Sequence, residues 1–101
     1  MSADIDIQID EKIEIETNEP NLYKVVFLND DYTPMDFVIN LLIEIFKHSG
    51  ESATALTNRI HLEGSGVVGI YTYEIAEQKA IEATNLCRSN DFPLRIRIEE
   101  E

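Results

Sequence analysis

The chain of 101 residues is short of several residue types, and each shortage excludes a class of protein. A single cysteine cannot close an internal disulfide, and two histidines leave little scope for a multi-histidine metal site. Lysine and arginine together number 8 against 20 aspartates and glutamates, which gives a formal net charge of -12. Because this charge repels phosphate backbones and anionic lipid headgroups, nucleic acids and membrane surfaces are poor candidate partners, and cationic groups are better ones.

Long hydrophobic runs are missing as well. No stretch approaches the roughly 20 apolar residues that a transmembrane helix needs, and the N-terminus lacks the basic and apolar regions of a signal peptide. Together with the unpaired Cys87, these features predict a protein of the reducing cytoplasm. We interpret Cys87 as small core filler on an apolar helix face. The length predicts one domain with one modest core.

The negative charge is concentrated in residues 1–21, which hold seven acidic residues and one basic residue. Isoleucines alternate with acidic residues there, which is a strand-like period. These isoleucines are Ile5, Ile7, Ile9, Ile13 and Ile15. Self-repulsion opposes compaction of so acidic a segment, so we expect residues 1–21 to be a disordered extension and residues 22–101 to be the folded domain.

Residues 22–101 show short β-branched runs alternating with helical patterns. Strands are expected over 23–28, 67–71 and 94–98, and helices over 33–48, 52–61 and 73–89. Thr33 is the expected N-cap of the first helix, with Pro34 at its first position. The order β-α-α-β-α-β predicts an α+β fold, a small three-stranded antiparallel sheet with three helices packed on one face.

The helical patterns also predict which side chains form the core. In the first helix these are Val38, Leu41, Leu42, Ile45 and Phe46. In the third helix they are Ile75, Ala76, Ala80, Ala83, Leu86 and Cys87.

The usual catalytic motifs are missing, including a glycine-rich phosphate loop, a cysteine pair, His-x-x-x-His and G-x-S-x-G. One polar cluster, Asn29, Asp30 and Asp31, lies between a strand end and a helix start. Its acceptors suit a cation, although carboxylates beside a helix N-terminus also satisfy the helix dipole. His61, at the end of the second helix, could converge on the same place. These residues alone predict no more than a cation-binding notch beside apolar residues.

The run from Tyr23 to Val38, YKVVFLNDDYTPMDFV, closely resembles the signature of the ClpS family, adaptors that hand N-degron substrates to the Clp protease. The resemblance covers about residues 22–98. It implies a monomeric adaptor that is not an enzyme and needs no cofactor. The implied partners are substrates with a free N-terminal Phe, Tyr, Trp or Leu, and the N-terminal domain of a ClpA- or ClpC-type unfoldase.

The resemblance also implies a role for each matched residue. The substrate's α-ammonium group would be held by Asn29, Asp30 and His61. Its first side chain would enter an apolar pocket, and Thr33 would touch the peptide backbone. The walls of that pocket would be Met35, Val38, Ile60 and Leu94.

Three further positions carry expectations from the family. Thr57 stands where well-known members have a methionine that acts as a gatekeeper over the pocket. Because threonine is shorter and polar, we expect a roomier pocket mouth and an altered preference that extends to Ile or Val. Glu74 and Lys79 match positions that dock the unfoldase, although both could simply belong to a solvated helix face.

Two alternatives remain open at the level of sequence. A ribosomal-stalk-like structural module would be similarly small, acidic and α+β, but it leaves the Asn-Asp-Asp-Tyr-Thr-Pro-Met run unexplained. A small metal-dependent hydrolase would use Asp30, Asp31 and His61, and metal analysis of the purified protein would distinguish it from an adaptor.

Overall fold

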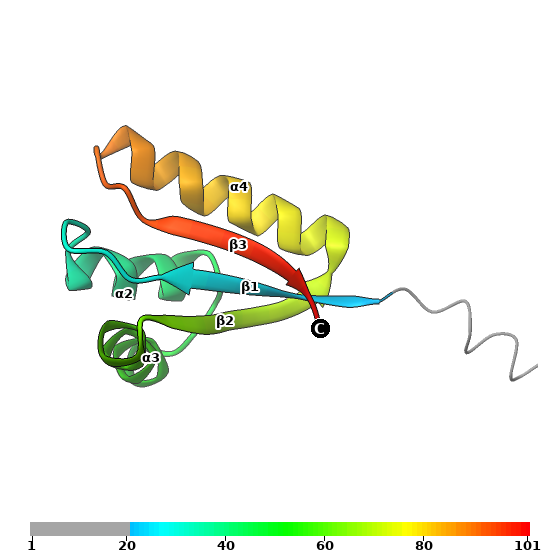
Figure 1. Cartoon of the computed structure of the whole chain (residues 1–101), viewed down its shortest axis with the longest axis horizontal. Helices are drawn as coiled ribbons and strands as arrows, with labels where there is room; N and C mark the ends of the chain where they lie inside the picture. The colour runs from blue at the N-terminus through cyan, green and yellow to red at the C-terminus, as the bar shows by residue number, and fades with distance from the viewer. Residues whose placement is uncertain (1–20) are drawn as a thin grey trace, which may run out of the picture.

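The computed structural model describes residues 21–101, so the disorder expected for residues 1–21 falls, apart from Asn21, outside the described part of the chain. Three strands and three helices follow one another in the order expected (Figure 1). They are β1 (Leu22–Leu28), α2 (Met35–Glu44), α3 (Gly50–Glu63), β2 (Ser65–Thr72), α4 (Tyr73–Ser89) and β3 (Arg95–Glu100). The sheet is antiparallel, and the predicted α+β class is confirmed.

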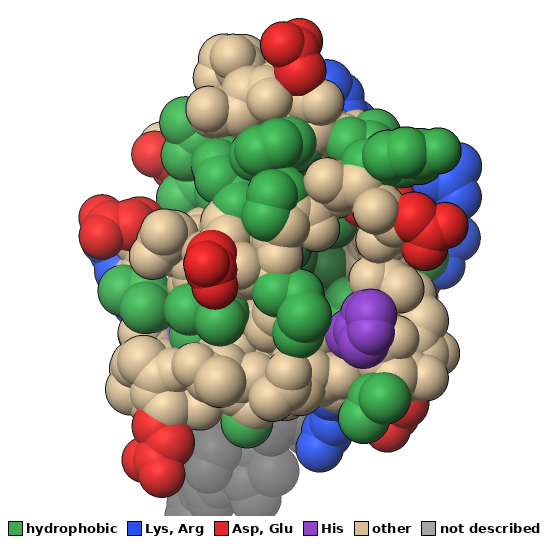
Figure 2. Space-filling model, turned by 90° about the vertical axis from the view of Figure 1, so that its left-hand side faces the viewer, with side chains coloured by type: hydrophobic (Ala, Val, Ile, Leu, Met, Phe, Trp, Pro, Cys, Tyr) green, Lys and Arg blue, Asp and Glu red, His purple; other side chains and the backbone are tan. Residues whose placement is uncertain are grey.

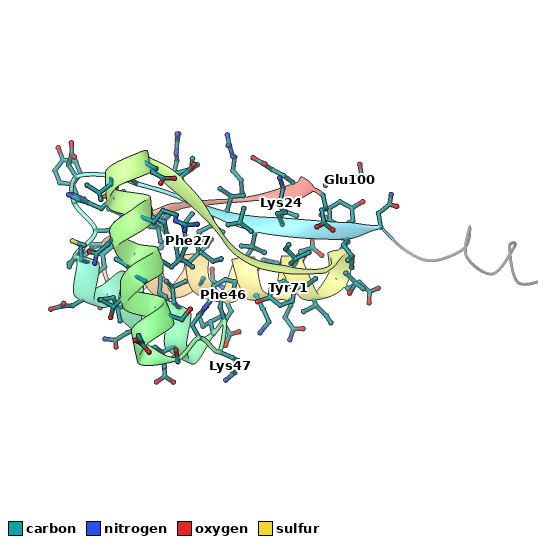
Figure 3. All side chains as sticks on the ribbon, turned by 90° about the horizontal axis from the view of Figure 1, so that it is seen from below. Lys24, Phe27, Phe46, Lys47, Tyr71 and Glu100 are labelled. Atoms are coloured by element: carbon teal, nitrogen blue, oxygen red, sulfur yellow. The ribbon has the colours of Figure 1, made fainter. Side chains whose placement is uncertain are left out.

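The sheet has the strand order β2-β1-β3, so β1 is paired along both of its edges. Val25 lies opposite Gly69 on β2 and Ile98 on β3, and the β2 register shifts by a bulge just after this point. Side chains alternate between the two faces of a strand, and Val25 and Phe27 are fully buried on the helix side. Figure 3 shows Phe27 on that side and Lys24 on the opposite face.

The core fills the space between the sheet and the helices. Leu41 and Leu42 of α2 are buried, and the ring of Phe27 meets that of Phe46 edge to face with centroids 5.5 Å apart. Ile45 and Phe46 lie beyond the end of α2 but remain buried, so the predicted core face of this segment is confirmed. Helix α3 packs against α2 and β2, while α4 packs against all three strands.

The buried face of α4 differs from the prediction. Its buried residues are Ala76, Ala80, Ala83 and Cys87, whereas Ile75 and Leu86 are 45% and 43% exposed. Small side chains let the helix approach the sheet closely, and the larger residues flank that stripe instead of entering it. Burial raises the pKa of the Cys87 thiol, and this outweighs the opposing effect of the Arg88 charge, so the side chain is an uncharged core filler as expected.

Both ends of α2 and of α3 also differ from the prediction, and α2 ends at Glu44, not at residue 48. Helix α2 begins after Pro34, whose carbonyl accepts hydrogen bonds from the N–H groups of Phe37 and Val38, so Thr33 is not its N-cap. Helix α3 begins at Gly50, because the Ser49 hydroxyl accepts a 3.1 Å hydrogen bond from the Ser52 N–H. It ends at Gly64, whose φ of 93° is accessible to glycine at little cost. None of the described helices is long and apolar enough to span a membrane.

Replacement of Phe27 tests the central position of β1. Phe27→Ala removes a fully buried ring that contacts Phe46, so we expect the free energy of unfolding to fall by about 3–5 kcal/mol. Urea denaturation followed by circular dichroism measures the change. The matched control is Leu62→Ala, which truncates a side chain that is 81% exposed and should change stability by less than about 0.5 kcal/mol. Equal losses in the two variants would contradict the assignment of the core.

Candidate functional site

The polar cluster lies where β1 leaves the sheet. The Asn29 N–H donates a 2.9 Å hydrogen bond to the Gly64 carbonyl, which ties the end of β1 to the turn between α3 and β2. His61 is in the last turn of α3, so this bond brings it to the same end of the molecule as Asn29 and Asp30. Figure 2 shows a histidine on this end, beside a hollow with hydrophobic side chains at its base.

The Asp30 carboxylate organises the connection from β1 to α2. One oxygen accepts hydrogen bonds from the N–H groups of Tyr32 and Thr33, both 2.8 Å long. The other oxygen accepts the Thr33 hydroxyl at 2.9 Å. These bonds form the local turn that Asp side chains favour, and they explain why the Thr33 hydroxyl does not cap α2. Thr33 is thus held half-buried beside the carboxylate.

The same carboxylate keeps capacity for a cation. An ionised carboxylate offers about four acceptor positions, and the loop uses three of them. Asp30 is half-buried, while Asn29 and His61 are exposed beside it. The arrangement therefore presents one partly desolvated negative charge, one amide and one imidazole at the rim of an apolar region.

Most of the predicted pocket residues belong to the core. Val38, Ile60 and Leu94 are 6%, 3% and 2% exposed and lie in one buried cluster, whereas Met35 is 38% exposed. Val38 and Met35 come from α2, Ile60 from α3, and Leu94 from the segment before β3. The structure therefore packs Val38, Ile60 and Leu94, from three separate segments, into one cluster, while the side chain of Met35 is open to solvent.

Thr57 is buried within α3, and only 3% of its surface is exposed. Its hydroxyl has no hydrogen-bond partner in the described residues, whereas the Thr54 hydroxyl donates to the Gly50 carbonyl at 2.8 Å. An unpaired buried hydroxyl costs about 1–3 kcal/mol. A residue that carries such a cost is typical of functional positions, where the side chain is not the one that gives the greatest stability.

The two predicted docking residues lie on α4 but have different surroundings. Glu74 is exposed in the first turn of the helix. The Lys79 ammonium group donates a 2.7 Å hydrogen bond to the Ile45 carbonyl and lies 6.0 Å and 5.5 Å from the ring centroids of Phe46 and Tyr71. Lys79 therefore helps to fix the end of α2, a role that its sequence position did not reveal.

The geometry does not support the hydrolase alternative. Within residues 21–101, no group of three or more His, Cys, Asp or Glu side chains is arranged to hold a metal ion. Asp30, Asp31 and His61 therefore do not form a metal-binding set.

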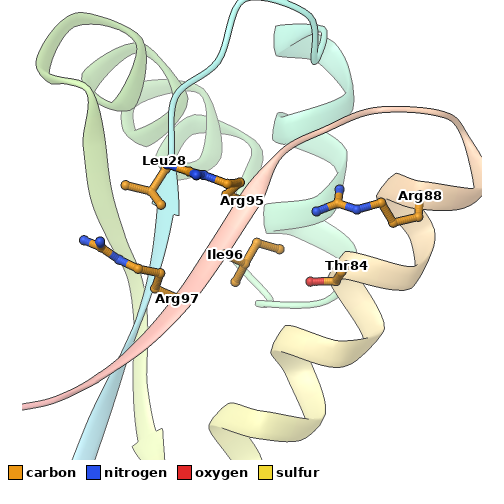
Figure 4. A pocket seen from close by; sticks show the side chains of 6 residues that line it. All are labelled: Leu28, Thr84, Arg88, Arg95, Ile96 and Arg97. Atoms are coloured by element: carbon orange, nitrogen blue, oxygen red, sulfur yellow. The ribbon is translucent and has the colours of Figure 1, made fainter.

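A second feature escaped the sequence reasoning. A hollow beside β3 is lined by Thr84 and Arg88 of α4 and by Arg95, Ile96 and Arg97 of β3. Figure 4 shows Arg95 and Arg97 on the side of β3 away from α4. The alternation of Arg95 and Arg97 with Ile96 was the available signal, but it predicted only a half-buried strand.

Comparison with known proteins identifies the family. A family model described as "ATP-dependent Clp protease adaptor protein ClpS" matches residues 18–97. The chain belongs to the ClpS family. The ClpS adapter of Helicobacter hepaticus is 48% identical over 82 residues, which are 81% of this chain and 83% of the relative. That of Shewanella halifaxensis is 45% identical over 93 residues, or 92% and 91% of the two chains.

A solved structure of a ClpS protein has the same fold. It is Agrobacterium tumefaciens ClpS2 bound to L-phenylalaninamide, which is 43% identical, with a TM-score of 0.80. The match covers 82% of this chain and 100% of that one. The protein is thus an adaptor of the Clp protease and not itself an enzyme, and the ribosomal-stalk alternative is set aside.

Proposed function

We propose that this ClpS protein binds substrates that begin with a free large hydrophobic residue, Phe, Tyr, Trp or Leu, and delivers them to the Clp protease. One observation carries the proposal: the Asp30 carboxylate, which follows the end of β1, keeps spare acceptor capacity after its three hydrogen bonds within the loop. The same end of the molecule has a hollow with hydrophobic side chains at its base (Figure 2). The similar ClpS2 was solved with L-phenylalaninamide, which has a free α-amino group and a phenyl ring. Its two chemical groups correspond to the two parts of this site.

The α-ammonium group would be held by Asn29, Asp30 and His61. An α-amino group has a pKa of about 7.7–8.0 and is mostly charged at neutral pH, with three N–H bonds to satisfy. One carboxylate, one amide oxygen and one imidazole nitrogen provide three acceptors. Hydrogen bonds to charged groups contribute about 1.5–3 kcal/mol each.

The first side chain would lie against Met35, Val38, Ile60 and Leu94, with Thr33 touching the peptide backbone and Thr57 bordering the pocket. A wall of the core with one open side can serve both packing and binding. Burial of a Leu or Phe side chain contributes roughly 1.5–3 kcal/mol. After the costs of association, these terms are compatible with binding at about micromolar dissociation constants.

Delivery would require a second surface. We place docking of the N-terminal domain of a ClpA- or ClpC-type unfoldase at the start of α4, around Glu74 and Lys79. Because the Lys79 ammonium group already binds the Ile45 carbonyl, the exposed Glu74 is the residue whose charge is free for a partner.

We place this monomeric adaptor in the reducing cytoplasm, in keeping with its unpaired Cys87. Its extension, residues 1–21, would take part in the transfer of substrate.

The ammonium site is tested with two peptides that begin with Phe and differ only in acetylation of the α-amino group. Acetylation removes the charge and two of the three N–H donors, so we expect affinity to fall at least about a hundredfold. Asp30→Asn keeps an acceptor for the loop but removes the charge, and it should weaken binding of the free peptide at least about tenfold. Fluorescence anisotropy measures both.

Asp31→Asn is the matched control, because it removes the charge of the adjacent exposed carboxylate and should leave affinity unchanged. Equal binding of the free and the acetylated peptide would overturn the proposed function.

The specificity at Thr57 is tested with labelled peptides that differ only in their first residue. We expect Ile and Val to bind within about a hundredfold of Leu, because threonine leaves more room than methionine. Thr57→Met should weaken Ile and Val selectively. If Ile and Val bind more weakly than that and the substitution changes nothing, Thr57 does not set specificity.

The docking surface is tested with the isolated N-terminal domain of the unfoldase. Glu74→Lys should weaken its binding by about tenfold or more while peptide affinity and stability stay unchanged, because the side chain is exposed. Glu82→Lys reverses an exposed charge farther along α4 and serves as the control. Binding of the unfoldase domain by Glu74→Lys as tight as by the control would exclude this surface.

A further inference from the structure

The outer edge of β3 borders an open groove against α4. At one end the groove is apolar, lined by Ile96 and Ile98 of β3 and by Ala80 and Ile81 of α4. Thr84 and Ile96 also line the hollow that contains Arg88, Arg95 and Arg97 (Figure 4), so the two depressions adjoin along the strand. We call the two adjoining depressions together the β3 groove.

The edge of β3 also offers backbone hydrogen-bonding groups. The Glu101 N–H donates to the Leu22 carbonyl at 2.9 Å, which sets the phase of the β1–β3 ladder. In an antiparallel pair, N–H and C=O groups of alternate residues point toward the partner strand. Those of Ile96, Ile98 and Glu100 therefore point away from β1, toward the free edge. An unpaired edge of this kind is a template for another strand.

The charge of the β3 groove is opposite to that of most of the protein. Three of the seven basic residues in 21–101 line it, Arg88, Arg95 and Arg97. The Arg88 guanidinium donates to the Phe92 carbonyl at 2.8 Å, and Arg97 pairs with Glu99 at 2.9 Å across exposed surface. Glu77 borders the apolar end. The groove thus favours an acidic occupant at its arginine end.

The chain carries a segment with this chemistry next to the groove. Asn21, the first described residue, donates its side-chain amide to the Glu100 carboxylate at the end of β3. The point at which the twenty preceding residues join the described fold, Asn21, therefore lies beside the end of β3. At up to about 3.3 Å per residue, they are long enough to turn back and run the length of β3.

The sequence of the segment matches the two sides of the edge. From Asp4 to Glu16 the five isoleucines stand at odd positions and the acidic residues, apart from Glu11, at even ones, which also include Gln8 and Lys12. A strand would therefore place the isoleucines on one face and all acidic residues except Glu11 on the other. On β3, Ile96 and Ile98 lie on the helix side and Arg95 and Arg97 on the other. A strand paired with β3 would therefore put its isoleucines over the apolar end of the groove and most of its carboxylates beside Arg95 and Arg97.

We propose that residues 4–16 dock in the β3 groove of their own chain as a fourth strand of the sheet. The tether supplies a high effective concentration, so a weak contact is sufficient. The segment is too acidic to fold alone, and docking neutralises part of its charge. Because the same segment cannot occupy the groove and contact a partner at once, docking would also control when the extension is available.

Amide hydrogen exchange in the full chain, followed by NMR, tests the proposal. The N–H groups of Ile96, Ile98 and Glu100 should exchange at least about tenfold more slowly than in a variant with Ile5, Ile7 and Ile9 replaced by Ser. The Arg95→Glu, Arg97→Glu double variant should lose the same protection. Raising the salt concentration to about 1 M, where the Debye length is about 3 Å, should reduce it.

The matched control is the Lys47→Glu, Arg59→Glu double variant, which changes the net charge equally away from the groove and should keep the protection. Equal exchange rates in the native chain and in the serine variant would overturn the proposal. Protection that rises with protein concentration would place the segment of a second copy in the groove, and it would overturn the intramolecular assignment.

Discussion

The pairing of β1 along both edges is the constraint on which the rest of the structure depends. It buries Val25 and Phe27 at the centre of the core and leaves β2 and β3 as the edges of the sheet. It also fixes the two ends of β1 at opposite ends of the sheet. The polar cluster follows the C-terminal end, and the acidic extension precedes the N-terminal end. The proposed recognition site and the residue at which the extension joins the fold, Asn21, therefore lie at opposite ends of one strand.

The Asp30 carboxylate links local structure to recognition. It accepts three hydrogen bonds from Tyr32 and Thr33, and these hold its oxygens in place before any ligand arrives. A preorganised acceptor loses little conformational entropy on binding, so more of the interaction energy appears as affinity. The net charge of -12 indicated only the sign of the partner. The proposed site depends on one carboxylate, supported by a neutral amide and an imidazole.

Periodicity predicted the order of all six elements because each strand and helix has a clear apolar pattern. It did not predict which apolar residues of α4 are buried, since Ile75 and Ala76 are both hydrophobic and only packing against the sheet selects the smaller one. Likewise, Thr33 and Ser49 are both good N-caps by type. The Ser49 hydroxyl caps α3, but the Thr33 hydroxyl donates to the Asp30 carboxylate and does not cap α2. Residue propensities do not include such hydrogen bonds between neighbouring side chains.

The candidate site, like the fold, could be predicted from the sequence only in part. The run from Asn29 to Met35 predicted the family from its residues, and family membership is confirmed. Two features of the site depend on how the elements pack together and could not be inferred from the sequence. They are the hydrogen bond from Lys79 to the Ile45 carbonyl and the unpaired hydroxyl of Thr57. The β3 groove was missed for the same reason, since its arginines come from both α4 and β3.

The most direct test of the central claim is a crystal structure of the protein with a peptide that begins with Phe. The account predicts the α-ammonium nitrogen within about 3 Å of the Asn29 amide oxygen, an Asp30 carboxylate oxygen and a His61 ring nitrogen. It also predicts the phenyl ring against Val38 and Leu94. A peptide bound elsewhere, or bound with its ammonium group in solvent away from Asp30, would contradict the account.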